Sequence, residues 1–179
     1  NSLTGQKLLL LGFGHIGKAV ARNARHLGMH VTAVRSHAEE SPEADAVFPP
    51  DKLHTLLPDA DFVSLHLPHN ETTHHFFGAK YFAIMKPGGY FINTARGQIV
   101  QEEDLIHALT EKQIMGAYLD VFNEEPLPRS SPLWDLDNVI ITPHYCDAVT
   151  DWQERFADFF AANLQQWMTQ GSLQNRIKT

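Results

Sequence analysis

The sequence predicts an α/β fold with a doubly wound, mostly parallel sheet and helices on both of its faces. Short apolar runs alternate with segments of helical spacing along the whole chain. The first run, at 8–11, is too apolar for a strand with one face in water, which indicates a central parallel strand. A glycine-rich turn then follows this run and opens a helix. With 179 residues, the chain is expected to form one domain over 1–179.

The predicted elements follow one another at short intervals. The strand over 8–11 leads through the glycine turn into a helix over 16–27, which Gly28 is suited to end. A strand over 29–34 completes a first βαβ unit. The further expected strands are 46–48, 60–67, 90–93, 114–119 and 138–142, and the further expected helices are 53–57, 76–85, 102–109 and 149–168.

The glycine-rich turn reads Gly-Phe-Gly-His-Ile-Gly at 12–17 and has the spacing of a dinucleotide-binding turn. Gly12 would permit the tight turn, Gly14 would let a pyrophosphate approach the backbone, and Gly17 would let the helix pack on the strand. The free amides and positive helix end at His15, Ile16 and Gly17 suit an anion. The motif alone is a weak signal, but here a strand precedes it and a helix follows it. The alternative is a glycine-rich turn that binds no ligand.

The residues after the second predicted strand bear on which dinucleotide binds. In this fold an acidic residue at that place holds the ribose 2′-hydroxyl, whereas an arginine accommodates a 2′-phosphate. The chain has Arg35 and Ser36 there and no aspartate at the strand end. NADP is therefore the expected cofactor, with NAD possible. The alternative for Arg35 is an exposed loop arginine.

The composition argues against several classes of partner. The formal net charge of −7 disfavours nucleic acid or an anionic membrane surface. No apolar run reaches transmembrane length, and the chain does not begin with a signal peptide. The single cysteine, Cys146, excludes an internal disulfide and is typical of a reducing compartment, so a cytoplasmic location is expected. Because the chain starts with Asn1 rather than Met, we expect a fragment or a processed chain.

Four histidines lie close together in the sequence, at His66, His69, His74 and His75. Histidine is a common zinc ligand, so a metal site is one interpretation. The set contains no cysteine and no convergent carboxylates, and the chain holds 11 histidines in all. We therefore favour structural or surface roles and predict no metal site.

Three polar residues, Arg96, Glu125 and His144, come shortly after successive predicted strands. Because strand ends gather at one edge of such a sheet, these side chains can converge beside the glycine turn. Arginine binds a carboxylate with two hydrogen bonds, histidine exchanges a proton near neutral pH, and a neighbouring carboxylate stabilises the charged ring. With a nicotinamide cofactor, these groups can interconvert a 2-oxo acid and a 2-hydroxy acid. Taken singly, each residue is better explained without chemistry, Arg96 by a surface ion pair, Glu125 as a solvated carboxylate and His144 as a capped loop residue. The hypothesis therefore depends on their joint placement beside the glycine turn.

At this point the chain resembles the cofactor-binding, Rossmann-type domain of the D-isomer-specific 2-hydroxyacid dehydrogenases, from residue 3 to about residue 144. The motifs that carry the resemblance are Gly-Phe-Gly-His-Ile-Gly at 12–17, Val-Ser-Leu-His-Leu-Pro at 63–68, Asn-Thr-Ala-Arg-Gly at 93–97, Asp-Val-Phe-Asn-Glu-Glu-Pro at 120–126 and Thr-Pro-His at 142–144. The resemblance implies that Arg96 binds the substrate carboxylate and carbonyl, that Glu125 pairs with His144, and that His144 is the acid/base. The further cofactor contacts that it implies are Asp120 at the nicotinamide carboxamide, Thr94 and Ala95 along the nicotinamide pocket, and Leu67, Pro68 and Asn70.

Within this family the chain looks like the glyoxylate/hydroxypyruvate reductases, whose members commonly use NADPH. The likeness rests on Glu-Glu-Pro-Leu-Pro at 124–128, Ser-Pro-Leu-Trp at 131–134 and Arg-Ser at 35–36. It implies hydride transfer between NAD(P)H and a small 2-oxo acid, glyoxylate or hydroxypyruvate. The competing class is a dinucleotide-binding sensor, similar to the family's corepressors, without significant turnover. The retained Arg96, Glu125 and His144, with no sign of a peptide-recruiting tail, favour the enzyme.

Three features depart from the family pattern. Tyr145, Cys146 and Asp147 follow the histidine where small residues are usual, which reshapes the pocket wall. Asn70 stands where a threonine often contacts the cofactor. The family's substrate-binding domain, which precedes the glycine turn, is absent from this chain. We therefore expect the chain alone to bind the dinucleotide and to turn over poorly.

The helix predicted over 149–168 carries an unusual number of aromatic residues near one face. An exposed apolar face of that size is usually an interface, and the resemblance implies pairing through this domain. We therefore expect a homodimer. The residues concerned are Trp152, Phe156, Phe159, Phe160, Leu164 and Trp167.

Overall fold

The computed structural model describes residues 2–146 and 148–175 of the chain. It divides into two compact units, Asn1–Cys146 and Asp147–Thr179. The described part of the first unit holds a sheet with its helices, and that of the second unit holds one long helix. A single dinucleotide-binding domain over the whole chain stays a prediction.

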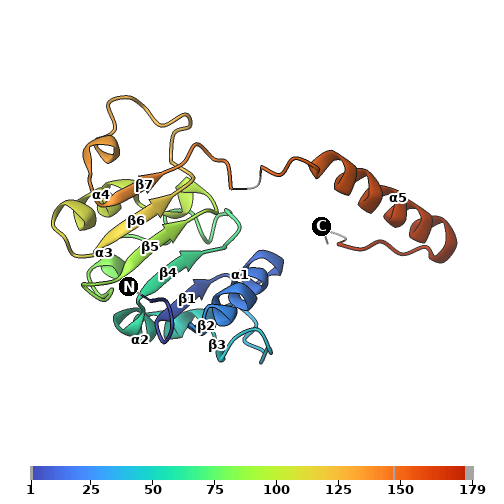
Figure 1. The fold of residues 1–179 in the computed structure, drawn as a ribbon, viewed down its shortest axis with the longest axis horizontal. Helices are drawn as coiled ribbons and strands as arrows, with labels where there is room; N and C mark the ends of the chain where they lie inside the picture. Colours follow the sequence, from blue (N-terminus) through green and yellow to red (C-terminus); the bar gives the residue numbers. More distant parts are fainter. Residues whose placement is uncertain (1, 147, 176–179) are drawn as a thin grey trace. The chain divides into compact units, whose positions relative to one another are not determined.

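Seven parallel strands form the sheet of the first unit, and Figure 1 shows them side by side from β3 at one edge to β7 at the other. The chain runs outward from β1 to β3 and then returns to β4 on the other side of β1. Sheets of this kind bind ligands at such a reversal. In spatial order the strands are β3 (Ala46–Phe48), β2 (His30–Val34), β1 (Lys7–Leu11), β4 (Phe62–Leu65), β5 (Tyr90–Asn93), β6 (Gly116–Leu119) and β7 (Val139–Ile141).

The side chains of β1 alternate between two hydrophobic cores, because both faces of this strand are covered. Leu8 and Leu10 belong to a core with α1 (His15–His26). Leu9 and Leu11 belong to a larger core on the other face, with α2 (Leu53–Leu56), α3 (Ala79–Phe82) and α4 (Glu102–Thr110). None of the four leucines is more than 5% exposed. The predicted doubly wound α/β fold with a buried central strand is therefore confirmed.

The α1 face is less well covered on β6 and β7. Paired residues of neighbouring strands lie side by side on the same face of the sheet. On the α1 face, one such row consists of Leu10, Ser64, Ile92, Tyr118 on β6 and Ile140 on β7. Ile140 is 64% exposed and Tyr118 is half-buried, whereas Leu10 is fully buried. Tyr118 therefore lies at the margin of the core.

The helix predicted over 76–85 is wrong in most of its length, since only Ala79–Phe82 is α-helical. Phe77 is extended and pairs with Val100 in an isolated parallel bridge. Its amide donates to the carbonyl of Ile99 at 3.0 Å, and its carbonyl accepts from the amide of Gln101 at 2.9 Å. This fully buried phenylalanine thus pairs like a strand residue, which its apolar spacing did not indicate.

The strand predicted over 60–67 is also shorter, at Phe62–Leu65. A 3-10 turn over Leu57–Asp59 precedes it, and the amide of Ala60 donates to the carbonyl of Leu57 at 3.3 Å. Ala60 therefore closes that turn instead of beginning the strand.

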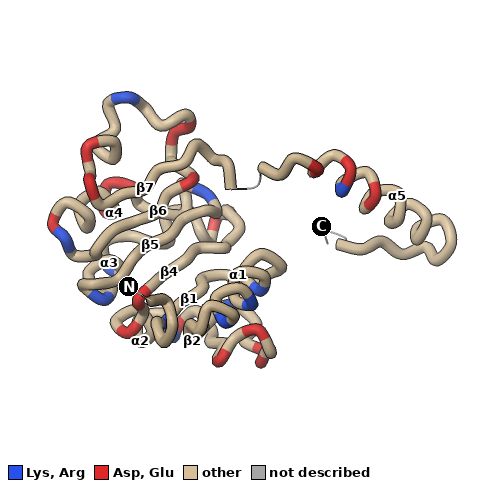
Figure 2. Tube along the Cα trace, in the orientation of Figure 1, with Lys and Arg blue, Asp and Glu red and all other residues tan. Residues whose placement is uncertain are grey.

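The helix α1 lies against the acidic loop that precedes β3, and Figure 2 shows its blue residues near that red loop. Lys18 Nζ and Arg22 Nη1 lie 3.7 and 3.4 Å from the carboxylate of Glu43. A hydrogen bond from Ser41 and the charges of Lys18 and Arg22 lower the pKa of Glu43. Such exposed pairs contribute little to stability, so they mainly orient the loop.

The second unit contains α5 (Trp152–Gln170), which ends at Gly171 in the left-handed conformation with φ of 65°. No residue of this helix is buried. Within residues 2–146 and 148–175, no helix combines the length and the apolar character that crossing a bilayer requires. The exposed large apolar residues of α5 are Trp152, Phe156, Phe159, Phe160, Leu164, Trp167 and Met168.

Candidate active site

The glycine-rich turn lies at the carboxyl end of β1, where the chain enters α1. Gly12 has φ of +97°, and its amide donates to the carbonyl of Val34 at 2.9 Å. A Cβ at Gly12 would lie 2.3 Å from the backbone oxygen of His66, and one at Gly17 would lie 2.4 Å from that of Gly12. A Cβ at Gly14 would meet no atom within 4 Å. The turn is therefore closed at Gly12 and Gly17 and open at Gly14, which fits a pyrophosphate group.

The amino end of α1 is free to meet an anion. Its N-cap, Gly14, supplies no side-chain hydrogen bond, and the first turn contains no acidic residue. His15 and Ile16 are exposed, and Ile16 is 70% exposed. The amides of His15, Ile16 and Gly17 have no acceptor within the helix, so they are available to a negatively charged ligand.

A cavity of about 260 Å³ lies between the ends of β1 and β2 and the segment after β4. Four predicted cofactor residues line it, namely Gly12, Arg35, Ser36 and Leu67. Among the described residues, no ion pair involves the guanidinium of Arg35. The sequence reasoning missed the other lining residues, although hydroxyl-bearing residues after a strand end are a usable signal. These residues are Leu11, Val34, Pro50, Leu53, Thr72, Thr73 and Phe76.

Pro68 and Asn70 form a turn beside this cavity and do not line it. Asn70 Oδ1 accepts hydrogen bonds from the amides of Thr72 and Thr73, at 2.9 and 3.2 Å. The hydroxyl of Thr73 donates to the carbonyl of Pro68 at 2.7 Å. Asn70 thereby fixes two threonines of the cavity wall, and its own contact with a cofactor stays a prediction.

Arg96 lies in a turn at the end of β5 that the buried amide of Asn93 holds together. Asn93 is 2% exposed; its Oδ1 accepts from the amide of Ala95 at 3.0 Å, and its Nδ2 donates to the carbonyl of Arg96 at 3.1 Å. The turn leaves Thr94 half-buried, Ala95 buried and Arg96 exposed. The sequence reasoning missed Asn93 as a positioning residue, although a polar residue ending a buried strand is the signal for one.

The turn after β5 approaches the segment after β6, because Gly97 carries no side chain. A Cβ at Gly97 would lie 2.0 Å from the carbonyl carbon and oxygen of Phe122. Glu125 follows three residues later, and the charge of Arg96 contributes to lowering the pKa of Glu125. The structure therefore brings Arg96 and Glu125 into one electrostatic site.

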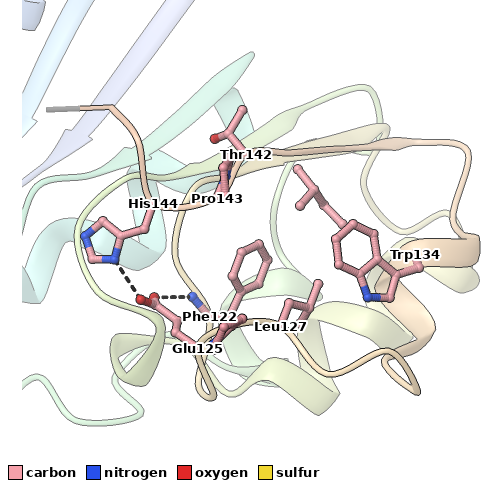
Figure 3. Close-up of a pocket in the computed structure, with 9 residues that line it drawn as sticks. Phe122, Glu125, Leu127, Trp134, Thr142, Pro143 and His144 are labelled. Carbon is pink, nitrogen blue, oxygen red and sulfur yellow. Dashed lines mark hydrogen bonds and ion pairs between the residues drawn. The ribbon is translucent and has the colours of Figure 1, made fainter. Parts of the chain in front are cut away.

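Glu125 and His144 form the predicted pair at the ends of β6 and β7, which Figure 3 shows. His144 Nδ1 and Glu125 Oε2 are 2.7 Å apart, and Glu125 Oε1 accepts from the amide of Phe122 at 3.0 Å. The side chain of His144 is 42% exposed and that of Glu125 is 35% exposed. With Nδ1 engaged by the carboxylate, Nε2 is the atom left to exchange a proton with a ligand.

The electrostatics of this pair keep the carboxylate charged. Burial raises the pKa of Glu125, but the hydrogen bonds from His144 and the Phe122 amide, with the charges of His144 and Arg96, outweigh burial and lower it. A charged Glu125 accepts the Nδ1 hydrogen and stabilises the protonated ring. This arrangement is suited to general acid/base chemistry.

An apolar cavity of about 670 Å³ adjoins the pair, with His144 and Glu125 at one end and Trp134 at the other (Figure 3). Trp134 Nε1 donates to the carbonyl of Pro128 at 2.9 Å, which orients an indole that is 53% exposed. The other lining residues are Phe122, Pro126, Leu127, Ile141, Thr142 and Pro143.

Asp120 follows β6 directly and is 1% exposed. Its carboxylate accepts hydrogen bonds from the hydroxyl of Thr142 and from the amides of Tyr145 and Cys146, the last two at 2.9 and 3.0 Å. Burial raises the pKa of Asp120, but these hydrogen bonds outweigh burial and lower it. Asp120 thus holds the segment that carries His144, and its contact with a nicotinamide stays a prediction.

The histidines after β4 lie near one another. His69 Nε2 and His74 Nδ1 are 3.0 Å apart, and the rings of His74 and His75 stack with centroids at 3.9 Å. His66 contacts the hydroxyl of Ser64 at 3.0 Å, and burial lowers the pKa of His66. In the described parts of the chain, no three His, Cys, Asp or Glu side chains converge as metal ligands.

Comparison with known proteins places the chain in a family. Residues 1–146 match the D-isomer specific 2-hydroxyacid dehydrogenase family, in its NAD binding domain. The chain is 40% identical over 160 residues to a glyoxylate reductase of Korarchaeum cryptofilum, covering 89% of this chain and 48% of the relative. It is 42% identical over 157 residues to a glyoxylate/hydroxypyruvate reductase B of Escherichia fergusonii, and the match covers 87% of this chain and 48% of that relative. The chain spans about half the length of these curated relatives.

Solved structures give the same result. A D-isomer specific 2-hydroxyacid dehydrogenase family protein from Aeromonas salmonicida has a TM-score of 0.89 at 36% identity, covering 99% of this chain and 57% of that one. A second match is the structure of an NADPH-dependent glyoxylate/hydroxypyruvate reductase from Sinorhizobium meliloti in complex with NADP and sulfate. Its TM-score is 0.88 at 26% identity, and the match covers 97% of this chain and 55% of that one. The chain therefore belongs to the D-isomer specific 2-hydroxyacid dehydrogenase family, with residues 1–146 corresponding to its NAD binding domain.

Proposed function

We propose that the complete protein that contains this chain transfers a hydride between NAD(P)H and a small 2-oxo acid, glyoxylate or hydroxypyruvate. The observation that carries the proposal is the His144–Glu125 pair, with Nδ1 and Oε2 2.7 Å apart beside Arg96. The substrate class is supported by the names of the relatives, which are a glyoxylate reductase and a glyoxylate/hydroxypyruvate reductase B.

The chain's own residues act on the carboxylate and the carbonyl oxygen of the substrate. When bound, NAD(P)H supplies the hydride for the carbonyl carbon. Arg96 binds the substrate carboxylate through two parallel hydrogen bonds and so orients the carbonyl. Protonated His144 donates from Nε2 the proton that the carbonyl oxygen takes up, and neutral His144 accepts it in the reverse direction. Glu125 stays charged and stabilises the imidazolium through Nδ1.

The residues that would hold the cofactor surround the glycine turn. The amides of His15, Ile16 and Gly17 suit the pyrophosphate, and the cavity lined by Arg35 and Ser36 suits the adenosine end. Thr94, Ala95 and Asp120 would lie on the nicotinamide side. NADP is preferred over NAD, because Arg35 stands where a carboxylate would repel a 2′-phosphate.

Titration of the complete protein with NADPH and NADH tests this preference. The variant Arg35→Asp should lose about tenfold or more in NADPH affinity, because a like charge then faces the 2′-phosphate. Its NADH affinity should stay the same or improve. Tighter binding of NADH than of NADPH by the unmutated protein would contradict the assignment.

The activity itself is tested by following NADPH consumption with glyoxylate and with hydroxypyruvate. The complete protein is required, because this chain spans about half the length of its curated relatives. Turnover of either acid supports the proposal. Dinucleotide binding without turnover of any small 2-oxo acid would instead indicate a sensor that resembles the family's corepressors.

We also infer that the protein is a cytoplasmic homodimer whose ligands are small acids, not nucleic acid or membranes. The exposed aromatic residues of α5 support the dimer, and the net charge of −7 disfavours polyanionic partners. The single cysteine of the chain supports the cytoplasmic location. Sedimentation of the complete protein at micromolar concentration checks the dimer, and a monomer would count against it.

A further inference from the structure

Four side chains attach the segment that carries His144 to the end of β6. Tyr118 lies in β6, and Asp120 is the residue that follows this strand. Thr142 lies two residues before His144, and Cys146 lies two residues after it. Tyr118 Oη is 3.0 Å from Thr142 Oγ1 and 3.2 Å from Cys146 Sγ. Thr142 Oγ1 in turn lies within hydrogen-bonding distance of Asp120 Oδ1. Both flanks of His144 are thus fastened to one strand end.

The number of available hydrogens fixes the direction of these hydrogen bonds. Asp120 is buried and its pKa is lowered, so its carboxylate only accepts. The hydroxyl of Thr142 gives its one hydrogen to Asp120 and therefore accepts from Tyr118. Tyr118 keeps its hydrogen at neutral pH: the contact with Cys146 raises the pKa of Tyr118, and with the contribution of burial it outweighs the contact with Thr142, which lowers that pKa. The hydrogen of the Cys146 thiol is then the one that the contact between Sγ and Tyr118 Oη uses.

His144 needs this support because of its backbone conformation. Its φ is +53°, in the left-handed region that residues other than glycine rarely adopt. Such conformations cost about 1–3 kcal/mol and persist only where the surroundings hold them. The side chain of His144 is 42% exposed, so packing around the ring contributes little. The constraint comes from the hydrogen bond between Nδ1 and Glu125 and from the two flanks.

We propose that Tyr118 is a positioning residue for His144, whose hydroxyl ties Thr142 and Cys146 to each other and keeps Nε2 aimed at the substrate. This inference rests on the proposed function, in which His144 exchanges the proton. Loss of the Tyr118 hydroxyl leaves the contact between Thr142 and Asp120 but removes the side-chain contact with Cys146. Misplacement of a reacting group by about 1 Å can cost about 10²-fold in rate, so a partial loosening is expected to cost about tenfold.

The test compares Tyr118→Phe with Tyr90→Phe in the complete protein. Tyr90 lies on the neighbouring strand β5, is 42% exposed and stacks on Phe62, so its hydroxyl serves as a matched control. In Tyr118→Phe, kcat for glyoxylate reduction should fall about tenfold, with KM and NADPH affinity within about twofold. In Tyr90→Phe all three should equal those of the unmutated protein.

A second measurement works without any activity. The amides of Tyr145 and Cys146 donate to Asp120, so their hydrogen exchange, followed by mass spectrometry, reports how firmly the segment is held. In Tyr118→Phe this exchange should speed up about fivefold or more, while exchange in β1 stays unchanged. Unchanged exchange at these amides overturns the inference, and so does faster exchange with unchanged kcat. Faster exchange in a protein that reduces no 2-oxo acid leaves the anchoring intact and removes the proposed function instead.

Discussion

The proposed nucleotide-binding half and the proposed acid/base half of the site, both at the carboxyl ends of the strands, are built by different means. Around Gly12 the backbone sets every position, and a single added Cβ would meet a carbonyl oxygen at 2.3 Å. Around His144 side-chain hydrogen bonds set the position, and the two partners of the pair are 42% and 35% exposed. Close backbone packing makes a site rigid and intolerant of substitution. Half-exposed side chains can instead respond to pH, to ligands and to single-atom changes.

Removal of the proposed acid/base group should give the largest effect and tests the proposed catalytic half alone. In the complete protein, His144→Ala should lower the rate of 2-oxo acid reduction by about 10²–10⁴-fold, because the proton donor is lost. NADPH affinity and the unfolding temperature should change little, since the imidazole is half-exposed and makes few contacts. Steady-state kinetics with glyoxylate measure the loss. Near-full activity of this variant would remove the mechanism.

A matched pair of glycine substitutions tests the nucleotide half. Gly12→Ala should destabilise the fold by about 3 kcal/mol, because its Cβ collides with the His66 backbone and its φ is +97°. Gly14→Ala should change stability by about 0.5 kcal/mol or less, because its Cβ points into open space. The affinity of Gly14→Ala for NADPH should still fall, about tenfold, since that space would receive the pyrophosphate.

Denaturant unfolding and cofactor titration measure the two quantities. Equal stability of the two variants would show that the close approach at Gly12 is not what shapes the turn.

Removal of the charge of Glu125 sharpens the comparison between the backbone-built and the side-chain-built parts of the site. This substitution changes the electrostatics of the Glu125–His144 pair and little else. Glu125→Gln should lower the rate of 2-oxo acid reduction about tenfold, because a neutral amide cannot stabilise the imidazolium as the carboxylate does. Steady-state kinetics with glyoxylate measure the loss, and cofactor affinity serves as the control. An unchanged rate would mean that Glu125 has no electrostatic role.

The smallest effect concerns a carboxylate at the amino ends of the strands, on the side of the sheet opposite to the site. Asp61 accepts from Lys86 Nζ at 2.6 Å and from the Lys7 amide at 2.8 Å, and these hydrogen bonds lower the pKa of Asp61. Its contribution to stability is therefore present above its ordinary pKa of 3.8 and is lost as pH falls through the lowered value. Asp61→Asn should lower the unfolding temperature by about 2 °C or less at pH 7, with the difference vanishing in acid. Thermal unfolding across pH checks this, and a difference that grows in acid would contradict it.

Local rules explain why much of the fold could be predicted from the sequence. The strand over Tyr90–Asn93 has the predicted bounds, because an apolar run between a Pro-Gly-Gly turn and a polar loop leaves little choice. The turn at Gly12 also follows from local spacing. The helix predicted from Phe76 was wrong, because the pairing of Phe77 with Val100 is a long-range contact that no local pattern shows.

The same reasoning limits what could be predicted of the site. The pair of Glu125 and His144 was predictable, since both residues follow strands that end at one edge. Asp120 gains its structural role from the amides of Tyr145 and Cys146, and Tyr118 gains its role from the side chains of Thr142 and Cys146, on a segment distant in the sequence. A carboxylate at a strand end can serve a ligand or a neighbouring segment equally well, so sequence alone assigns Asp120 to neither.

The strand order also sets the order in which the two halves can form during synthesis. β1 pairs with β2 on one side and with β4 on the other, where Leu8 meets Phe62. Once Phe76 has left the ribosome, every residue that lines the cavity beside Gly12 has been made. β7 is the last strand of the sheet along the chain, and His144 follows it. A chain that folds as it is made therefore holds the residues of this cavity before it holds His144, and a dinucleotide bound there would stabilise the earlier part while the later part is still being translated.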